Sequence, residues 1–159
     1  MKSLQQLLTL TIVLTLVFKT FQVAGELRPL YRCLVFGWEH MVSLDVGCEG
    51  HRAVALMGYL YKNPNELAKI PIYRCLHGID HFTSIHPNCE GHRVEGLMGY
   101  VSETDPRQQG LSAVPLYHCV TIFGNNHFVA HTINCEGQRT LSLHGYIALS
   151  PWSLSPLPS

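Results

Sequence analysis

One pattern occurs three times in this chain of 159 residues, and it constrains the fold more than any other feature. In each copy a histidine precedes the cysteine of a Cys-Glu-Gly segment by eight positions, and that cysteine precedes the glycine of a Gly-Tyr pair by ten. Because a pattern repeated at constant spacing is the signature of a repeated structural unit, we expect three copies of one unit. The anchors are His40, Cys48 and Gly58; His81, Cys89 and Gly99; and His127, Cys135 and Gly145.

Each unit opens with a proline and an alternating apolar run, starting at Pro29, Pro71 and Pro115. Aromatic and β-branched residues that alternate after a proline predict a strand with tyrosine and cysteine on one face. A second alternating run begins at the repeated histidine, and a third surrounds the Gly-Tyr pair with apolar residues at period two. The Gly-Tyr glycine predicts a β-bulge or a close backbone approach, and the glycine of Cys-Glu-Gly predicts a corner with positive φ.

These units start 42 and 44 residues apart and predict an all-β, pseudo-threefold domain of the β-trefoil type, with a closed sheet and no open edges. The fourth strand that a trefoil unit requires is an inference, and a barrel or prism of three-stranded units is the alternative. We expect a single domain over residues 26–149, with units at 29–70, 71–114 and 115–149. The serine- and proline-rich residues 150–159 predict a flexible tail.

Residues 1–25 predict a secretory signal peptide. Lys2 supplies a positive start, Leu7–Phe18 is an uncharged run of twelve mostly apolar residues, and small residues precede Glu26. Twelve residues fall well short of the roughly 20 that span a bilayer. We therefore expect cleavage after Gly25 and a secreted, extracellular product without membrane insertion.

All six cysteines lie after the predicted cleavage point. Six cysteines permit about 15 pairings, and units built alike leave two schemes: bonding within each unit or cyclic bonding between units. We favour bonding within units, because a hairpin places the first strand beside the corner. Zinc-thiolate sites are disfavoured, since no Cys-x-x-Cys occurs and an oxidising compartment favours disulfides. The expected bridges are Cys33–Cys48, Cys75–Cys89 and Cys119–Cys135.

Every repeated histidine follows a residue with a side-chain oxygen. The structural interpretation is that the ring caps the hairpin by a local hydrogen bond. One functional alternative is a ligand pocket in each unit that binds sugar hydroxyls, and another is convergence of the three imidazoles on a divalent metal. If a ligand exists, we expect its contacts from these residues, because loops on a rigid scaffold usually carry recognition. The candidates are Glu39, His40, Asp80, His81, Asn126 and His127.

A glutamate and an arginine also lie three positions apart after each corner cysteine. We interpret each pair as a partly buried ion pair that holds its own corner, with anion capture by the three arginines as the alternative. The pairs are Glu49 and Arg52, Glu90 and Arg93, and Glu136 and Arg139.

Charge and motifs exclude several classes of function. Residues 26–159 carry nine basic and eleven acidic side chains without a basic stripe, so nucleic acid is not an expected partner. The chain has no Gly-x-Ser-x-Gly elbow, His-Glu-x-x-His helix or glycine-rich phosphate loop, so we expect neither enzymatic activity nor a cofactor. Repeated polar sites suit multivalent binding instead, where linked weak sites gain avidity.

The order Leu-Tyr-Arg, Asp-His-Phe, Cys-Glu-Gly and Gly-Tyr resembles a tandem-repeat module of unknown function, found in secreted proteins and attached to extracellular enzymes. The resemblance covers residues 29–149 and is best in the second unit. The first unit departs from the pattern at Glu39 and Met41, and the third at His118, Asn126 and Gln138. The resemblance implies secretion and an accessory or binding role.

We therefore predict a secreted, non-enzymatic binding module with lectin-like, multivalent glycan binding. The expected partner is a glycan or an extracellular protein, and the sequence leaves the oligomeric state open. A structural component of extracellular matrix, mucus or coat is the alternative prediction, and a secreted hydrolase ranks below both.

Overall fold

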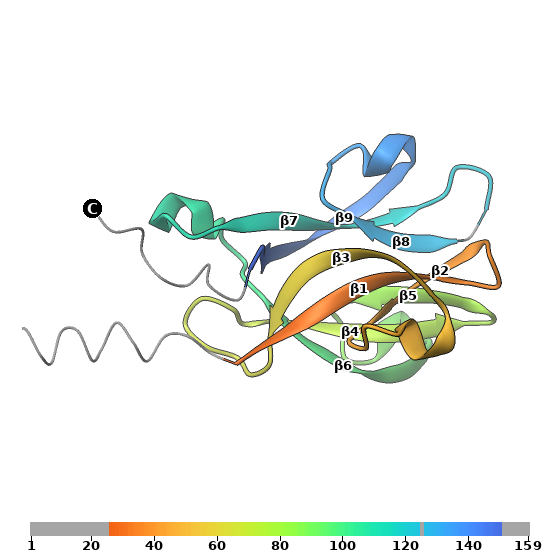
Figure 1. The fold of residues 1–159 in the computed structure, drawn as a ribbon, viewed down its shortest axis with the longest axis horizontal. Coiled ribbons are helices and arrows are strands. Elements are labelled where there is room, and N and C mark those ends of the chain that lie inside the picture. The colour runs from red at the N-terminus through yellow and green to blue at the C-terminus, as the bar shows by residue number, and fades with distance from the viewer. Residues whose placement is uncertain (1–25, 125, 151–159) are drawn as a thin grey trace, which may run out of the picture.

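A computed structural model describes residues 26–124 and 126–150 (Figure 1). The predicted signal peptide, residues 1–25, and residues 151–159 of the predicted tail lie outside this part of the chain. The described residues form nine β-strands and four short 3-10 turns, without an α-helix. The predicted all-β class is thereby confirmed. A helix long and apolar enough to cross a membrane is absent from these residues.

Three groups of strands follow one another along the chain, each in the order strand, strand, 3-10 turn, strand. Unit 1 contains β1 (Leu27–Val35), β2 (Glu39–Ser43), η1 (Cys48–Gly50) and β3 (Arg52–Tyr61). Unit 2 contains β4 (Ile70–His77), β5 (Asp80–Ser84), η2 (Cys89–Gly91) and β6 (Arg93–Val101). After the connecting turn η3 (Pro106–Gln109), unit 3 contains β7 (Ala113–Val120), β8 (His127–Ala130), η4 (Cys135–Gly137) and β9 (Arg139–Ala148).

The first strand of each unit is central and pairs antiparallel with the other two strands of that unit. The units join through their third strands, by the residue pairs Tyr61 with Tyr100, Tyr59 with Ala148, and Ser102 with Tyr146. The sheet is open, because β2, β5 and β8 each pair with one neighbour only among the described strands. The closed sheet and four-stranded units expected of a trefoil are therefore not seen in the described chain, where each unit has three strands.

A bulge interrupts the third strand of each unit, as the Gly-Tyr glycine predicts. In unit 1, Leu30 lies opposite Gly58 while Tyr31 lies opposite Leu56, so Met57 is an extra residue without a partner. The bulge turns Met57 into the core and leaves Leu56 45% exposed. Strict alternation through the glycine would place both on the wrong faces, because one extra residue reverses the faces beyond it.

The glycine beside the bulge marks a close approach between units. A Cβ atom on Gly99 would lie 2.7 Å from the carbonyl oxygen of Tyr61 and 2.8 Å from Cβ of Leu60. Gly58 and Gly145 meet backbone oxygens of neighbouring units in the same way. Only glycine permits this contact, since any side chain would overlap backbone atoms that cannot move aside.

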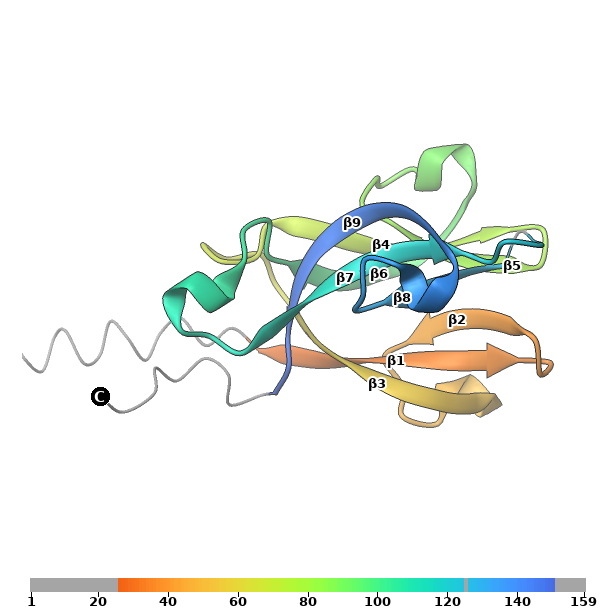
Figure 2. The ribbon, with the colours of Figure 1, turned by 90° about the horizontal axis from the view of Figure 1, so that it is seen from above.

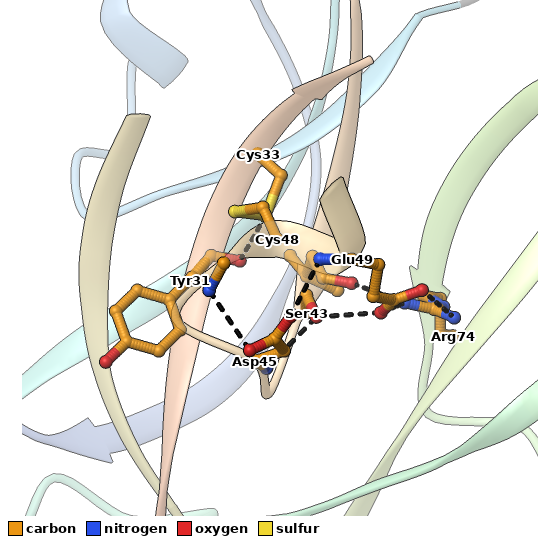
Figure 3. The surroundings of a disulfide bond; sticks show 9 residues. Tyr31, Cys33, Ser43, Asp45, Cys48, Glu49 and Arg74 are labelled. Carbon is orange, nitrogen blue, oxygen red and sulfur yellow. Dashed lines mark hydrogen bonds and ion pairs between the residues drawn. A yellow bond between two sulfur atoms is a disulfide. The ribbon is translucent and has the colours of Figure 1, made fainter. Parts of the chain in front are cut away.

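Three disulfides hold the corners onto the central strands. They are Cys33–Cys48, Cys75–Cys89 and Cys119–Cys135, each within one unit. Gly50, Gly91 and Gly137 have φ values of 90°, 91° and 87°, which confirms the predicted corner. The preceding cysteine and glutamate of each corner are left-handed too, which the sequence did not indicate. Figure 3 shows the first corner, where Tyr31 lies beside the Cys33–Cys48 bridge.

The main core lies between the three units, and each unit contributes to it. Its buried side chains are Leu30, Val42, Met57, Leu60, Ile72, Met98, Val101, Leu116, Val129 and Ile147. Three smaller clusters surround the disulfides. The turns of the hairpins β1–β2, β4–β5 and β7–β8 gather at one end, opposite the start of β1 and the end of β9 (Figures 1 and 2). This arrangement brings three turns that are far apart in sequence to a common surface.

Candidate functional site

The six candidate residues predicted from the sequence form one network of hydrogen bonds between units. Each carboxylate or amide group accepts two bonds from the histidine of the next unit, one from its backbone N–H and one from its ring. Glu39 Oε1 lies 2.9 Å from His81 N and 3.1 Å from His81 Nδ1. The equivalent pairs are Asp80 with His127, and Asn126 with His40. The candidates are thus brought together, but each binds another candidate.

This network gives a hydrogen-bond acceptor to one backbone N–H on each open edge of the sheet. His81 and His127 lie on β5 and β8, whose outer edges have no neighbouring strand among the described residues. An unpaired N–H at a buried edge is costly, and here the oxygen of the preceding unit accepts it. Glu39 is only 2% exposed. The arrangement therefore supports a scaffold role for these residues, but the expected local cap of each hairpin is wrong, because every ring bonds a neighbouring unit.

His81 is held between two carboxylates. The hydrogen bond from Nδ1 to Glu39 raises the pKa of His81, an effect that burial opposes and that the nearby Glu95 strengthens. Its Nε2 lies 3.6 Å from Glu95 Oε2. Because a carboxylate only accepts hydrogen bonds, Nδ1 carries a proton, and the surroundings favour the charged imidazolium.

The corner glutamates do not pair with the arginines three residues later, as the sequence had suggested. Glu49 instead binds Arg74 of unit 2 at 2.5 Å and accepts a bond from Ser43 of its own unit (Figure 3). Glu136 binds Arg32 of unit 1 at 2.7 Å in the same manner. The hydrogen bond from Arg74 lowers the pKa of Glu49. These two ion pairs thus join neighbouring units, and their arginines belong to the Tyr-Arg-Cys segments of the first strands.

An open hollow of about 620 Å³ lies at the gathered hairpin turns. All three units contribute to it. Its lining is Trp38 from unit 1; His77, Gly78, Ile79 and Asp80 from unit 2; and Thr121, Phe123, Gly124 and Asn126 from unit 3. Two candidates from the sequence, Asp80 and Asn126, therefore line the hollow. His81 and His127 do not line it, and their rings bind Glu39 and Asp80.

The rim of this hollow is strongly apolar. Phe123 is 100% exposed, Ile79 69% and Trp38 54%, and Phe36, 83% exposed, lies on the same turn as Trp38 but outside the lining. Hairpin turns are usually polar, yet these turns expose large apolar side chains and no lysine or arginine. Sequence reasoning focused on the histidines and missed this surface. The apolar composition of the three turns is visible in the sequence, but the sequence does not show that the turns gather at one end of the molecule.

The hollow offers aromatic faces beside a few hydrogen-bonding groups. Asp80 and Asn126 are fixed by their bonds to neighbouring units, and Asn126 Nδ2 also donates to the carbonyl of Trp38. Within residues 26–124 and 126–150, no group of three or more His, Cys, Asp or Glu side chains is placed to hold a metal ion. The three repeated imidazoles each bind a different acceptor. The polar groups beside the hollow are thus held in place by hydrogen bonds between units.

No protein-family model, curated protein or solved structure matches the chain. The class that the fold and the site define is an all-β, disulfide-bonded protein with an aromatic-rimmed hollow at its hairpin turns.

Proposed function

We propose that the three units are arranged around a pseudo-threefold axis. Three kinds of contact support this arrangement: the bonds of the polar network, the arginine–glutamate pairs and the close glycine approaches. Wherever such a contact occurs, it joins unit 2 to unit 1, unit 3 to unit 2, or unit 1 to unit 3 in the same sense. Of the two predicted architectures, three strands per unit favour the barrel or prism over the trefoil.

We propose that the protein is a secreted, non-enzymatic binding module that holds a glycan in the hollow at its hairpin turns. The observation that carries this proposal is the lining of the hollow, where exposed aromatic rings lie beside fixed polar groups. Sugar rings present apolar C–H faces that stack on aromatic side chains and hydroxyl groups that bond amides, hydroxyls and carboxylates. A volume of about 620 Å³ lies within the usual range of small-molecule sites.

The site that we propose is one composite site instead of three equal ones. Each unit contributes different side chains to the hollow, among them Trp38, Ile79 and Phe123. The equivalent polar residues of the three units are occupied with one another. Multivalent binding by three independent pockets stays a prediction, and it would require ligand contacts outside this network.

Secretion is part of the same proposal. The three disulfides indicate an oxidising, extracellular environment, because cytosolic proteins rarely keep such bonds. The apolar run and small residues of the first 25 positions supply the signal. Expression of the full chain in secreting cells, followed by N-terminal sequencing of the released protein, tests cleavage after Gly25. Retention of the uncleaved chain in the cell would contradict it.

A glycan array probed with residues 26–159 tests the binding proposal. We expect retention on a defined subset of glycans, and a loss of about fivefold to tenfold in affinity for Phe123→Ala and Ile79→Ala, or roughly 1 kcal/mol each. Ile133→Ala is the matched control, because Ile133 is 71% exposed but lies outside the lining of the hollow. All three variants should keep the thermal stability of the natural protein. Failure of the folded protein to retain any glycan, or an equal loss for Ile133→Ala, would refute the proposal.

One observation favours the alternative of a structural matrix component. The third strand of each unit exposes two aliphatic side chains, each between 41% and 45% exposed, and the leucine of each pair lies eight positions after the corner cysteine in all three units. Such faces allow a protein to assemble with copies of itself in several directions. The residues are Val54 and Leu56, Val94 and Leu97, and Leu141 and Leu143. Sedimentation velocity across a concentration series distinguishes the two functions, since a matrix component assembles without ligand and a simple binding module does not.

A further inference from the structure

The three contacts between neighbouring units are not alike. Where unit 2 meets unit 1, Arg74 bonds both the carbonyl of Val42 and the carboxylate of Glu49. Arg32 makes the same two bonds to Val129 and Glu136, where unit 1 meets unit 3. At the third contact, between units 2 and 3, the Tyr-Arg-Cys sequence reads Tyr-His-Cys, and the arginine is replaced by His118.

His118 is buried without the bonds that the arginines make. It is 6% exposed, and its Nε2 has no hydrogen-bond partner within the described residues. Its ring stacks on Phe82 of unit 2, with 6.2 Å between centroids and 13° between planes. The rings of His127 and His144 each lie 5.1 Å from it. At this contact aromatic rings therefore take the place of the arginine–glutamate ion pair found at each of the other two.

Two further replacements occur at the same contact. Thr83 stands where the other units have Val42 and Val129, and His144 stands where they have Met57 and Met98. The Oγ1 of Thr83 and Nε2 of His144 are 2.8 Å apart, and both residues are buried. One polar pair thus replaces two apolar core residues. The replacements at positions 83, 118 and 144 all fall between units 2 and 3.

His118 and His144 are held neutral by their surroundings. Burial, reinforced by His144 and His127, lowers the pKa of His118 to about 3, although Glu90 and Asp80 oppose the change. Burial also lowers the pKa of His144 to about 4, with a contribution from His86 in the same direction and an opposing one from the bond to Thr83. Both depressed pKa values mean that protonation favours any state in which the rings reach water.

The contact is mechanically linked to the hollow. His127, whose ring lies beside His118, is bound through its backbone and its ring to Asp80. Asp80 lines the hollow, as do Thr121 and Phe123 on the turn that follows β7. Separation of units 2 and 3 would therefore pull two of the three turns apart.

We propose that the contact between units 2 and 3 is an acid-sensitive joint: protonation of His118 and His144 opens it, while the other two contacts stay closed. As far as this concerns ligand, it rests on the proposed function, and it makes the hollow lose its ligand in mildly acidic surroundings. The opening itself requires no ligand, so it is tested separately.

Amide hydrogen exchange of residues 26–159 at pH 7.4 and pH 5, corrected for intrinsic exchange rates, tests the joint. A histidine that binds a proton only in the open state raises the population of that state about tenfold for each pH unit below 6.5. Each such histidine should therefore lower the protection factor about 30-fold at pH 5. We expect this loss at the amides of Ser102, His127 and Tyr146, whose hydrogen bonds cross this contact, with protection kept at those of His40 and His81, whose bonds cross the other two contacts.

The sibling units supply the control variants. His118→Arg provides a partner for Glu90, and the double variant Thr83→Val with His144→Met restores the apolar pair of the other units. Each should reduce the acid-induced loss of protection at the amides of Ser102, His127 and Tyr146. Equal loss at all three contacts, or the same loss in the natural protein and both variants, would overturn the proposal. Should a variant fail to fold, proton NMR titration of the natural protein remains decisive, because imidazole signals that all titrate near pH 6.5 would also overturn it.

Discussion

Replacement of His81 by alanine separates the two roles that the sequence allows for the polar network. The ring donates from Nδ1 to Glu39, whose carboxylate is 2% exposed and whose Oε2 has no hydrogen-bond partner among the described residues. After His81→Ala, the only remaining donor to this carboxylate is the backbone N–H at position 81, at 2.9 Å. The substitution therefore leaves a buried charge with half of its hydrogen bonds.

The expected cost follows from the kind of bond that is lost. A hydrogen bond to a charged group contributes about 1.5 to 3 kcal/mol, and a buried acceptor left short of donors adds to the loss. We expect the free energy of unfolding to fall by about 2 kcal/mol near pH 6. The His81 side chain is 20% exposed, which keeps the expected value away from the upper end of the range.

The cost depends on pH in a definite direction. The pKa of His81 is raised in the folded protein, so the imidazolium–carboxylate contribution is fully present below the unfolded value of about 6.5. It is lost as the pH rises through the raised folded pKa. His81→Ala should therefore cost less near pH 9, about 1 kcal/mol, as for an ordinary hydrogen bond.

Urea unfolding with the disulfides intact, near pH 6 and near pH 9, measures both quantities. His92→Ala is the matched control, since the exposed His92 side chain contacts the rings of His77 and Phe82 and its backbone bond to Cys89 survives the substitution. It should change stability by less than about 0.5 kcal/mol at either pH. If His81→Ala keeps full stability but loses glycan binding, the scaffold assignment is wrong and the histidine contacts the ligand.

Three further predictions concern the fold. Gly99→Ala should lower the free energy of unfolding by about 2 to 4 kcal/mol in thermal unfolding, because its Cβ would overlap Tyr61 and Leu60. Gly91→Ala, at a φ of +91° in open space, should cost about 1 to 2 kcal/mol, and equal losses for the two variants would refute the close approach. Removal of the Cys75–Cys89 bridge by two alanines, which opens a loop of 14 positions, should cost about 3 kcal/mol in urea, and unchanged stability would contradict the intra-unit bond. The depressed pKa values of His118 and His144 make the unfolded state bind more protons than the folded state at acid pH. The free energy of unfolding should therefore be highest above about pH 6.5 and fall by up to about 2.7 kcal/mol per pH unit as the pH drops toward 4. A flat profile, measured by urea unfolding from pH 7 to pH 4.5, would show that these rings are not buried in neutral form.

Local features of this protein could be predicted from the sequence alone. The alternating run around Tyr31 and Cys33 forms β1, and the glycine of each Cys-Glu-Gly corner takes a positive φ. Each disulfide closes over 14 to 16 positions within its own unit. These features depend on residues close together in the chain, where side-chain alternation and backbone preferences act without help from distant segments.

The partners of the polar residues could not be predicted in this way. Glu49 has Arg52 three positions away, yet it binds Arg74, and Glu39 binds His81 instead of its own neighbour His40. The bulge at Met57 also reverses the side-chain faces that simple alternation predicts. The two pairings depend on how one unit is placed against the next, which no single unit encodes, whereas the bulge lies within unit 1 and only its effect on the side-chain faces was missed.

The hollow and the contact around His118 also depend on how the three units pack against one another. The sequence by itself determined the three units, their strands and their disulfides, because each of these is stabilised within about 40 residues of chain. Only the tertiary structure brought Trp38, Ile79 and Phe123 to one surface and gathered Thr83, His118 and His144 at one contact. The physical reason is that packing between units sets the register of third strand against third strand, and this register places side chains more than 30 residues apart within hydrogen-bonding distance.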